Sequence, residues 1–144
     1  MAESDGTEPI DDDELLYRRI PVSMGWYSDG TLSPEAFNPR PDELTGVSIY
    51  RAKYKTLEEV AKGRGKKGYF VAVLRAGDLR QHGIDVAPRP NTPDGHDPGH
   101  AELPGLTAEN RDTDSALERK LALSTLTLQV QGPFVATVAN GDSA

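Results

Sequence analysis

The sequence predicts a single small α+β domain, with a mixed sheet of about four to six strands, two or three short helices and long loops. Three observations support this fold class. The chain has 144 residues, which is the usual size of one domain. Segments with the composition of strands are interspersed with segments that carry helix-capping signals. Finally, 14 Gly and 11 Pro with a hydrophobic fraction of 36% indicate many turns around a modest core.

The acidic residues are concentrated at the N-terminus. Residues 1–14 carry seven acidic side chains and no Lys or Arg, which accounts for the formal net charge of −7. Acidic and basic side chains balance in the rest of the chain. We therefore predict an acidic disordered tail at 1–14, one α+β domain at 15–131 and a flexible C-terminal tail at 132–144.

Composition also restricts the compartment and the chemistry. The chain has no Cys, which excludes disulfides, thiolate catalysis and Cys-ligated zinc. Its first residues lack the basic and apolar regions of a secretory signal, and no apolar run is long enough to span a bilayer. We expect a cytoplasmic protein without membrane contact.

The elements of the N-terminal half follow from turn and capping signals. A strand is expected at 15–22, followed by a turn-rich stretch with one helical turn at 33–37. The alternation at 47–50 predicts a half-buried strand. A helix should begin at Thr56, because Glu59 completes a capping box with it, and should end at Gly63.

The C-terminal half contains the strongest strand signal. Residues 69–74 are β-branched, aromatic and nearly all apolar, which predicts a strand buried on both faces. A short helix at 78–82, strands at 84–86 and 100–103 and a loop at 88–99 are expected around it. A last helix should begin at Ser115 with Glu118 as its capping partner. Leu117, Leu121 and Leu128 share one face of that helix, although the alternation of 125–131 would also suit a strand.

Two adjacent arginines lie on the first expected strand. Side chains alternate across a strand, so Arg18 or Arg19 should point into the domain interior. A half-buried guanidinium needs an anionic partner. That partner is either the carboxylate of Glu58 or Glu59, in a structural ion pair, or a bound anionic ligand.

The densest group of metal-ligating residue types lies between Asp94 and Glu102. Imidazole and carboxylate groups suit zinc, so His96, His100 and Glu102 are candidate ligands. Pro98 predicts a loop here, and in a loop the spacing of these residues does not make their side chains point the same way. An ordinary polar loop, and a role for His100 or Glu102 without metal, are the alternatives.

A basic, glycine-rich loop follows the first helix. Arg64, Lys66 and Lys67 are candidate anion-binding residues, because glycines let backbone amides approach a phosphate. The loop lacks the order of a P-loop, and the rest of the chain is electrically balanced with few aromatics. A solvated turn is the alternative, and we do not expect a nucleic-acid partner.

Five short patterns resemble those of small bacterial proteins of uncharacterised function. They are LYRRI at 16–20 (with Leu16 its first residue), LSPEAF at 32–37, VSI at 47–49, GYFVAV at 68–73 and GHAE at 99–102. This resemblance covers most of the domain and implies no activity.

The order of elements is also similar to that of RES/ADP-ribosyltransferase-like domains, which use NAD. The likeness lies in Tyr17-Arg18, the strand and helix around Tyr50 and Glu59, and the stretch from Val71 to Leu79. It implies that Arg18 contacts an NAD phosphate with Tyr50 and Glu59 nearby. The Gly-Gly-Arg-Trp-Asn-like segment of RES domains is missing from this chain.

The functional hypothesis that the sequence favours is a small bacterial binding or accessory module that acts through another protein. It rests on an electrically balanced domain without a diagnostic catalytic motif. The alternative is a small enzyme, which would use NAD through Arg18, Tyr50 and Glu59 or a metal such as zinc through His96 and His100.

Overall fold

The computed structural model describes residues 6–62 and 68–134 of the chain. Its centre is a six-stranded antiparallel sheet with the strand order β10-β5-β1-β4-β9-β6. This is the α+β class that the sequence predicts. The sheet consists of β1 (Leu15–Pro21), β4 (Val47–Arg51), β5 (Tyr69–Arg75), β6 (Ala87–Pro88), β9 (His100–Leu103) and β10 (Gln129–Phe134).

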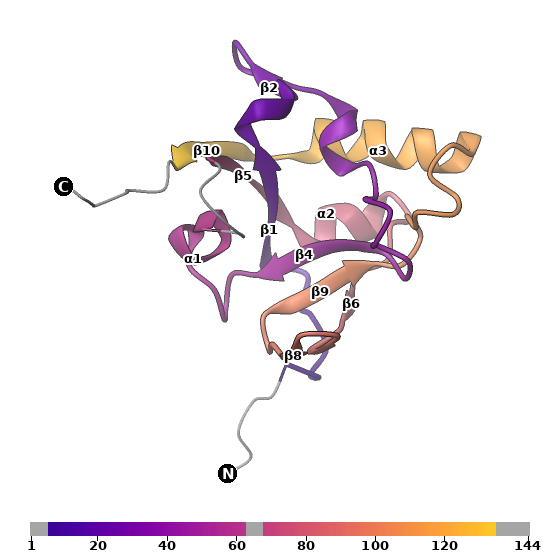
Figure 1. The fold of residues 1–144 in the computed structure, drawn as a ribbon. Helices are drawn as coiled ribbons and strands as arrows, with labels where there is room; N and C mark the ends of the chain where they lie inside the picture. Colours follow the sequence, from indigo (N-terminus) through magenta and orange to yellow (C-terminus); the bar gives the residue numbers. More distant parts are fainter. Residues whose placement is uncertain (1–5, 63–67, 135–144) are drawn as a thin grey trace, which may run out of the picture.

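Helices cover the two faces of the sheet unequally. Figure 1 shows α1 on one side of β1 and β5, and α2 and α3 on the other. Two small hairpins and two 3-10 turns complete the described chain. The helices are α1 (Leu57–Lys62), α2 (Ala76–Gln81) and α3 (Asp114–Leu126). The hairpins pair β2 (Tyr27–Ser28) with β3 (Thr31–Leu32) and β7 (Asn91–Thr92) with β8 (Gly95–His96), and the turns are η1 (Val22–Met24) and η2 (Pro34–Phe37).

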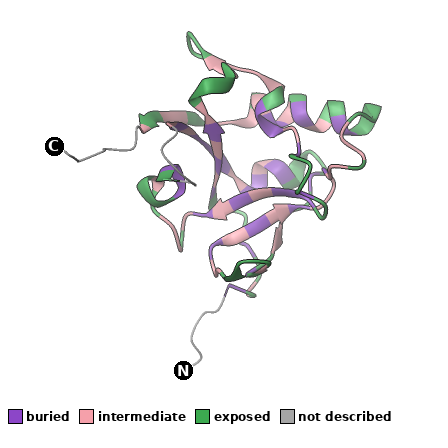
Figure 2. Cartoon of the chain, in the orientation of Figure 1, coloured by how far each residue is buried: buried purple, intermediate pink, exposed green. Residues whose placement is uncertain are grey.

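The larger core lies between the sheet and the layer formed by η2, α2 and α3. Strand alternation supplies it, and Figure 2 shows buried residues alternating with partly exposed ones along β1, β4 and β9. A smaller core lies on the other face, where α1 packs over β5. Among the strands of the described residues, only β5 is buried on both faces over several consecutive residues, as its apolar sequence predicts. The larger core includes Leu16, Ile20, Phe37, Val47, Ile49, Leu74, Leu79, Leu103 and Leu123.

The first helix begins as its capping box predicts. The Thr56 hydroxyl accepts a hydrogen bond from the Glu59 N–H (3.1 Å), and the Glu59 carboxylate accepts one from the Thr56 N–H (2.9 Å). The two bonds satisfy backbone donors that the first turn of a helix leaves unpaired. These hydrogen bonds hold Glu59 at the exposed start of α1.

The N-cap of the last helix lies two residues earlier than the sequence predicts. Thr113, not Ser115, is the N-cap, and its hydroxyl accepts the Ala116 N–H at 3.2 Å. Thr and Ser are both good N-cap residues, so the residue type does not decide which of the two caps the helix. The path of the backbone into the helix decides it. The helix ends at Leu126 and β10 follows at Gln129, so the helix and the strand considered for 125–131 each occupy part of that stretch.

The exposed side of α3 is also unexpected. Leu117 and Leu121, on the face that the leucine spacing marks, are 48% and 58% exposed. The buried residues of the helix are instead Ala116, Lys120 and Leu123. The Lys120 ammonium donates to the Asn38 side chain at 2.9 Å, and this hydrogen bond offsets part of the cost of burying the ammonium next to η2.

Residues 6–14 of the acidic N-terminal segment do not form the disordered tail that its composition predicts. Ile10 is part of the larger core, and the carboxylate of Glu14 accepts two hydrogen bonds from Arg51, at 2.6 and 3.0 Å. Arg51 is fully buried and also donates to the backbone carbonyl of Glu8 at 3.2 Å. Residues 6–14 therefore pack against the domain, because the buried Arg51 needs anionic and carbonyl partners.

Two other boundaries differ from the prediction. Strand β10 pairs with β5 as far as Phe134, so the sheet extends past the boundary expected at residue 131. Residues 84–86 form no strand, and the short edge strand lies at Ala87–Pro88 instead. Ile84 is buried in the larger core. The loop expected at 88–99 contains the hairpin of β7 and β8.

Candidate functional site

The structure separates the two adjacent arginines onto opposite faces of the sheet. Arg18 is 5% exposed on the core side and forms an ion pair with Glu43 at 3.0 Å. It also donates to the backbone carbonyls of Ala36 (3.1 Å) and Ser48 (3.0 Å). The sequence correctly indicates that one arginine points inward, but its partner is Glu43 and not Glu58 or Glu59. The pairing of β4 with β1 brings the loop that contains Glu43 next to Arg18. Local spacing in the sequence could not show this contact, because the two residues lie far apart along the chain.

The Arg18–Glu43 ion pair holds β4 in place where its ladder with β1 ends. The paired positions of these strands are Leu16 with Arg51 and Tyr17 with Tyr50. Farther along, the Ser48 N–H donates to Glu43 at 2.7 Å, and the Ser48 carbonyl accepts from Arg18. Buried backbone groups need such partners when a neighbouring strand does not supply them. The ion pair therefore fixes the backbone of Ser48 from both of its polar groups.

The environment of Glu43 keeps its carboxylate ionised. Burial by itself raises the pKa of this carboxyl group. The charge of Arg18 and the hydrogen bonds from Arg40 N–H, Arg18 and Ser48 N–H act in the opposite direction and prevail, so the pKa lies below its ordinary value. Arg18 and Glu43 thus form a charged, hydrogen-bonded pair under the sheet.

Arg19 lies on the other face, where α1 covers only part of the sheet. Its guanidinium carbon is 5.6 Å from the centre of the Tyr50 ring and 5.4 Å from that of Tyr69. These are distances at which a cation is attracted to an aromatic face. One of its nitrogens donates to the Val60 carbonyl at 3.2 Å. Within residues 6–62 and 68–134, Arg19 forms no ion pair with an Asp or Glu.

Ser48 and His100 form a hydrogen-bonded pair beside Tyr50. The His100 Nε2 atom is 3.1 Å from the Ser48 hydroxyl, and Nδ1 is 2.8 Å from the carbonyl oxygen of Arg89. The His100 ring meets the Tyr50 ring edge to face, with 5.8 Å between their centres. Residues 48, 50 and 100 come together because Tyr50 pairs directly with His100 between β4 and β9.

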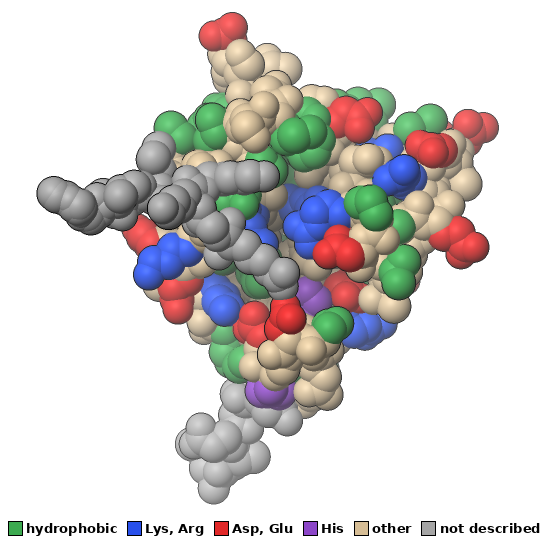
Figure 3. All heavy atoms as spheres, in the orientation of Figure 1, with side chains coloured by type: hydrophobic (Ala, Val, Ile, Leu, Met, Phe, Trp, Pro, Cys, Tyr) green, Lys and Arg blue, Asp and Glu red, His purple; other side chains and the backbone are tan. Residues whose placement is uncertain are grey.

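We call Arg19, Ser48, Tyr50, Tyr69 and His100 the open-face cluster. Except for the buried Tyr69, its members are partly exposed, and they come from β1, β4, β5 and β9. Figure 3 shows Lys and Arg side chains, a His side chain and acidic side chains close together near the centre of the view. The cluster offers a cation, a hydroxyl paired with an imidazole, and aromatic surface within one face of the sheet.

Of the NAD-contact candidates, only Tyr50 belongs to this cluster. Arg18 is buried on the opposite face of the sheet, and Glu59 caps the start of α1. The structure does not bring Arg18, Tyr50 and Glu59 together. The anion-binding candidates Arg64, Lys66 and Lys67 lie outside the described residues.

The three metal-ligand candidates also point to separate partners. His96 bonds to the Asn91 side chain at 3.0 Å, and Glu102 accepts from the Thr45 hydroxyl at 2.8 Å. His100 has both nitrogens engaged with Arg89 and Ser48. In the described part of the chain, no three His, Asp or Glu side chains are grouped to hold a metal ion.

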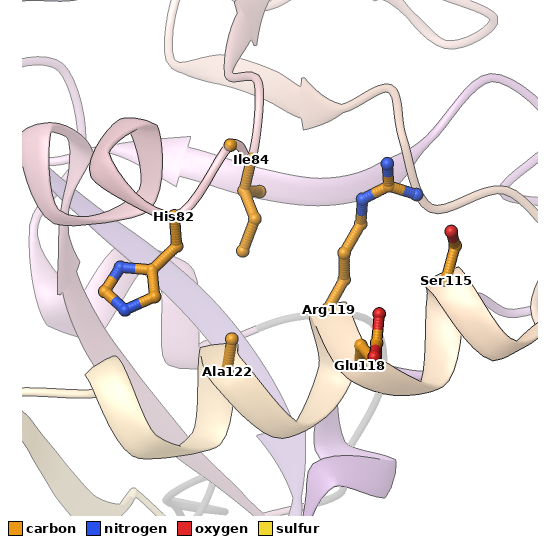
Figure 4. Close-up of a pocket in the computed structure, with 7 residues that line it drawn as sticks. His82, Ile84, Ser115, Glu118, Arg119 and Ala122 are labelled. Carbon is orange, nitrogen blue, oxygen red and sulfur yellow. The ribbon is translucent and has the colours of Figure 1, made fainter.

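Two cavities lie away from the open-face cluster. One, of about 300 Å³, lies between the end of α2 and the first turns of α3, and Figure 4 shows the His82 ring and Arg119 at its opposite ends. Arg119 donates to the Gly105 carbonyl at 3.1 Å. The other, of about 550 Å³, is lined by Pro41, Leu44, Ala108, Glu109 and Arg111. The first cavity has Ser115, His82 and Glu118 in its lining, but within the described residues no hydrogen bond joins the Ser115 hydroxyl to either base. The open-face cluster, where the Ser48 hydroxyl bonds to His100, is therefore the better candidate.

Sequence reasoning missed Ser48, Tyr69, Glu43 and the carbonyl of Arg89 as partners in this site. The alternation of β4 places Ser48 and Tyr50 on one face, and this signal was available. That His100 lies beside them follows from strand pairing, which the sequence does not specify.

No protein-family model, curated protein or solved structure matches the chain. None of the helices within the described residues is long and apolar enough to cross a bilayer.

Proposed function

We propose that this protein is a binding module, and that it captures an anionic group of a protein partner on the open face of its sheet. Arg19 is the principal contact in this proposal. The observation that carries it is the position of the Arg19 guanidinium, held between Tyr50 and Tyr69 without an acidic partner among the described residues.

The surroundings of Arg19 favour binding over a purely structural role. A guanidinium has five N–H donors, and the one hydrogen bond that this group forms with residues 6–62 and 68–134 goes to the Val60 carbonyl. The two tyrosine rings and this bond restrict the side chain before a ligand arrives. Restriction in advance lowers the entropy lost on binding. A carboxylate or phosphate could accept the remaining donors in a bidentate arrangement.

The shape of the site favours a macromolecule as partner. The open-face cluster lines neither of the two cavities, whereas small-molecule sites are usually enclosed pockets. Arg and Tyr are also the residue types that contribute most at protein interfaces. An acidic segment of another protein meets both requirements, because it supplies anions from an extended surface.

The experiment is an NMR titration of the ¹⁵N-labelled full chain with two short peptides of equal length. One peptide has central Glu residues, and the other has Gln in their place. We expect shifts of the Arg19 Nε–H signal and of the Tyr50 and His100 amides with the Glu peptide only. Added salt should weaken the effect, because exposed charges are screened.

The matched variants are Arg19→Gln and Arg111→Gln. Arg111 also donates to a single carbonyl among the described residues, that of Pro39 at 3.5 Å, but it lies at the 550 Å³ cavity. Loss of a charge-assisted contact should weaken binding about tenfold or more in Arg19→Gln, with little change in Arg111→Gln. Shifts of equal size in both variants, or none with the Glu peptide, would contradict the proposal.

The rival hypothesis is the NAD-dependent enzyme. It requires Arg18, Tyr50 and Glu59 at one ligand, and their separation across the sheet gives it less support than the binding module has. The metal-assisted enzyme requires His96 and His100 at one ion, and their hydrogen-bond partners differ.

A further inference from the structure

The hydrogen bonds of His100 determine which of its nitrogens carries a proton. The Arg89 carbonyl oxygen can only accept, so at 2.8 Å from it the neutral ring must carry its proton on Nδ1. Nε2 then has a lone pair, and it accepts the hydroxyl proton of Ser48 across 3.1 Å. The Ser48 oxygen therefore stands beside a base that can take its proton.

We propose that Ser48 is a nucleophile with His100 as its general base, and that it accepts the acyl group of an ester. Three parts support this assignment: a hydroxyl, a base within hydrogen-bonding reach of it, and a third group that orients the base. The Arg89 carbonyl is the orienting group. It fixes the same tautomer that an orienting carboxylate fixes in serine hydrolases.

Ser48 is held in place by bonds from the core side of the sheet, and His100 is held by the ring beside it. The Ser48 N–H and carbonyl bond to Glu43 and Arg18, so the strand cannot shift without breaking its hydrogen bonds to a buried ion pair. The His100 ring contacts the edge-to-face Tyr50 ring. Arg18 is thus a positioning residue here, because it acts on Ser48 from the opposite face.

The chemistry is an acyl transfer in two steps. The Ser48 oxygen attacks the ester carbonyl carbon while its proton moves to Nε2 of His100. The bond from that carbon to the alcohol oxygen then breaks, and Nε2 returns the proton to the departing alcohol. Water repeats the sequence on the acyl-serine, with His100 again as base, and releases the acid and free Ser48.

Arg19 indicates the class of ester. Arg19 on β1 and His100 on β9 both lie near the Tyr50 ring, and β4, which carries Tyr50, lies between these two strands. An ester with a carboxylate or phosphate on its acyl group could therefore place that anion at Arg19 and its carbonyl at Ser48. This preference for an anionic ester rests on the proposed function, whereas the reactivity of Ser48 does not.

The test treats the full chain with para-nitrophenyl acetate and with the mono-para-nitrophenyl ester of succinic acid. Nitrophenol release is followed by absorbance, and the acyl adduct is located by peptide mass spectrometry. We expect the adduct on Ser48 and none in Ser48→Ala. General-base catalysis contributes at least about a hundredfold, so His100→Gln should slow acylation by that factor.

Two control variants remove the same types of side chain, a Ser and a His, at positions outside the cluster. Ser124→Ala removes a hydroxyl that bonds to the Leu121 carbonyl, and His96→Gln removes an imidazole that bonds to Asn91. Both should react like the unmodified protein. An adduct on any residue other than Ser48, or a His100→Gln rate equal to that of His96→Gln, would overturn the assignment of Ser48.

The two esters separate this inference from the proposed function. In Arg19→Gln, the succinyl ester should react about tenfold more slowly, whereas the uncharged acetate should react at the original rate. If both esters acylate Ser48 in that variant at the rates of the unmodified protein, Ser48 is a nucleophile and Arg19 is not the anion site. Thermal melting of each variant confirms that a lost adduct does not reflect a lost fold.

Discussion

Replacement of Glu43 by Gln should destabilise the protein severely, because Arg18 would remain as a buried charge without its counter-ion. Both side chains are almost fully inaccessible, and the carboxylate also accepts the N–H groups of Arg40 and Ser48 at 2.7 Å. Gln keeps the shape and one acceptor oxygen but removes the negative charge. Breaking a buried ion pair in this way costs about 3–5 kcal/mol.

That loss is a large part of the stability of a domain, which is commonly about 5–15 kcal/mol. For a chain of this size it corresponds to a fall in melting temperature of about 10 °C or more. Urea unfolding followed by far-UV circular dichroism measures the change in the free energy of unfolding. The matched control is Asp42→Asn, because this neighbouring carboxylate is 77% exposed and should contribute less than about 1 kcal/mol.

The effect should depend on pH in a defined direction. Since the pKa of Glu43 is lower in the folded protein than in the unfolded chain, ionisation stabilises the fold above the unfolded pKa of about 4.3. This contribution is lost as the pH falls through the folded pKa. The difference between Glu43→Gln and the unmodified protein should therefore be largest near neutral pH and shrink in acid. A loss no greater than that of Asp42→Asn, or one that grows in acid, would refute the reasoning.

Three further changes test other parts of the fold. Thr113→Ala should cost about 1 kcal/mol in urea unfolding because Thr113 caps α3, whereas Ser115→Ala should change little; the reverse order would show that the helix begins as the sequence suggests. Arg51→Met should cost about 3–5 kcal/mol and expose the amides of residues 6–14 to hydrogen exchange, while unchanged protection there would contradict the packing of that segment. Gly46→Ala should lower the melting temperature, since its Cβ would lie 2.7 Å from the Leu103 carbonyl oxygen at a φ of +151°; an unchanged melting temperature would show that the backbone adjusts freely.

Local signals predicted the elements whose determinants lie within a few residues. Thr56 and Glu59 cap a helix because their reciprocal bonds form within a single turn. The run 69–74 forms a strand buried on both faces because nearly all of its side chains are apolar and avoid water on either face. These predictions needed no knowledge of the rest of the fold.

Other features depended on residues distant in sequence. Leu117 and Leu121 define an apolar face by spacing, yet α3 buries Ala116, Lys120 and Leu123, because η2 and Asn38 meet the helix on that side. The acidic composition of residues 1–14 suggests disorder. Arg51 reverses this for residues 6–14, because its buried charge draws the carboxylate of Glu14 to it.

The sequence by itself determined the α+β class, the capped first helix, the doubly buried strand and the inward direction of one of two adjacent arginines. Period-2 alternation and capping chemistry act over short distances, and this explains their success. Only the tertiary structure decided that Glu43 pairs with Arg18, that residues 6–14 join the domain, and that Ser48, Tyr50 and His100 meet beside Arg19. These juxtapositions arise from the pairing of β1, β4 and β9, and the register and order of antiparallel strands are set by packing across the whole sheet.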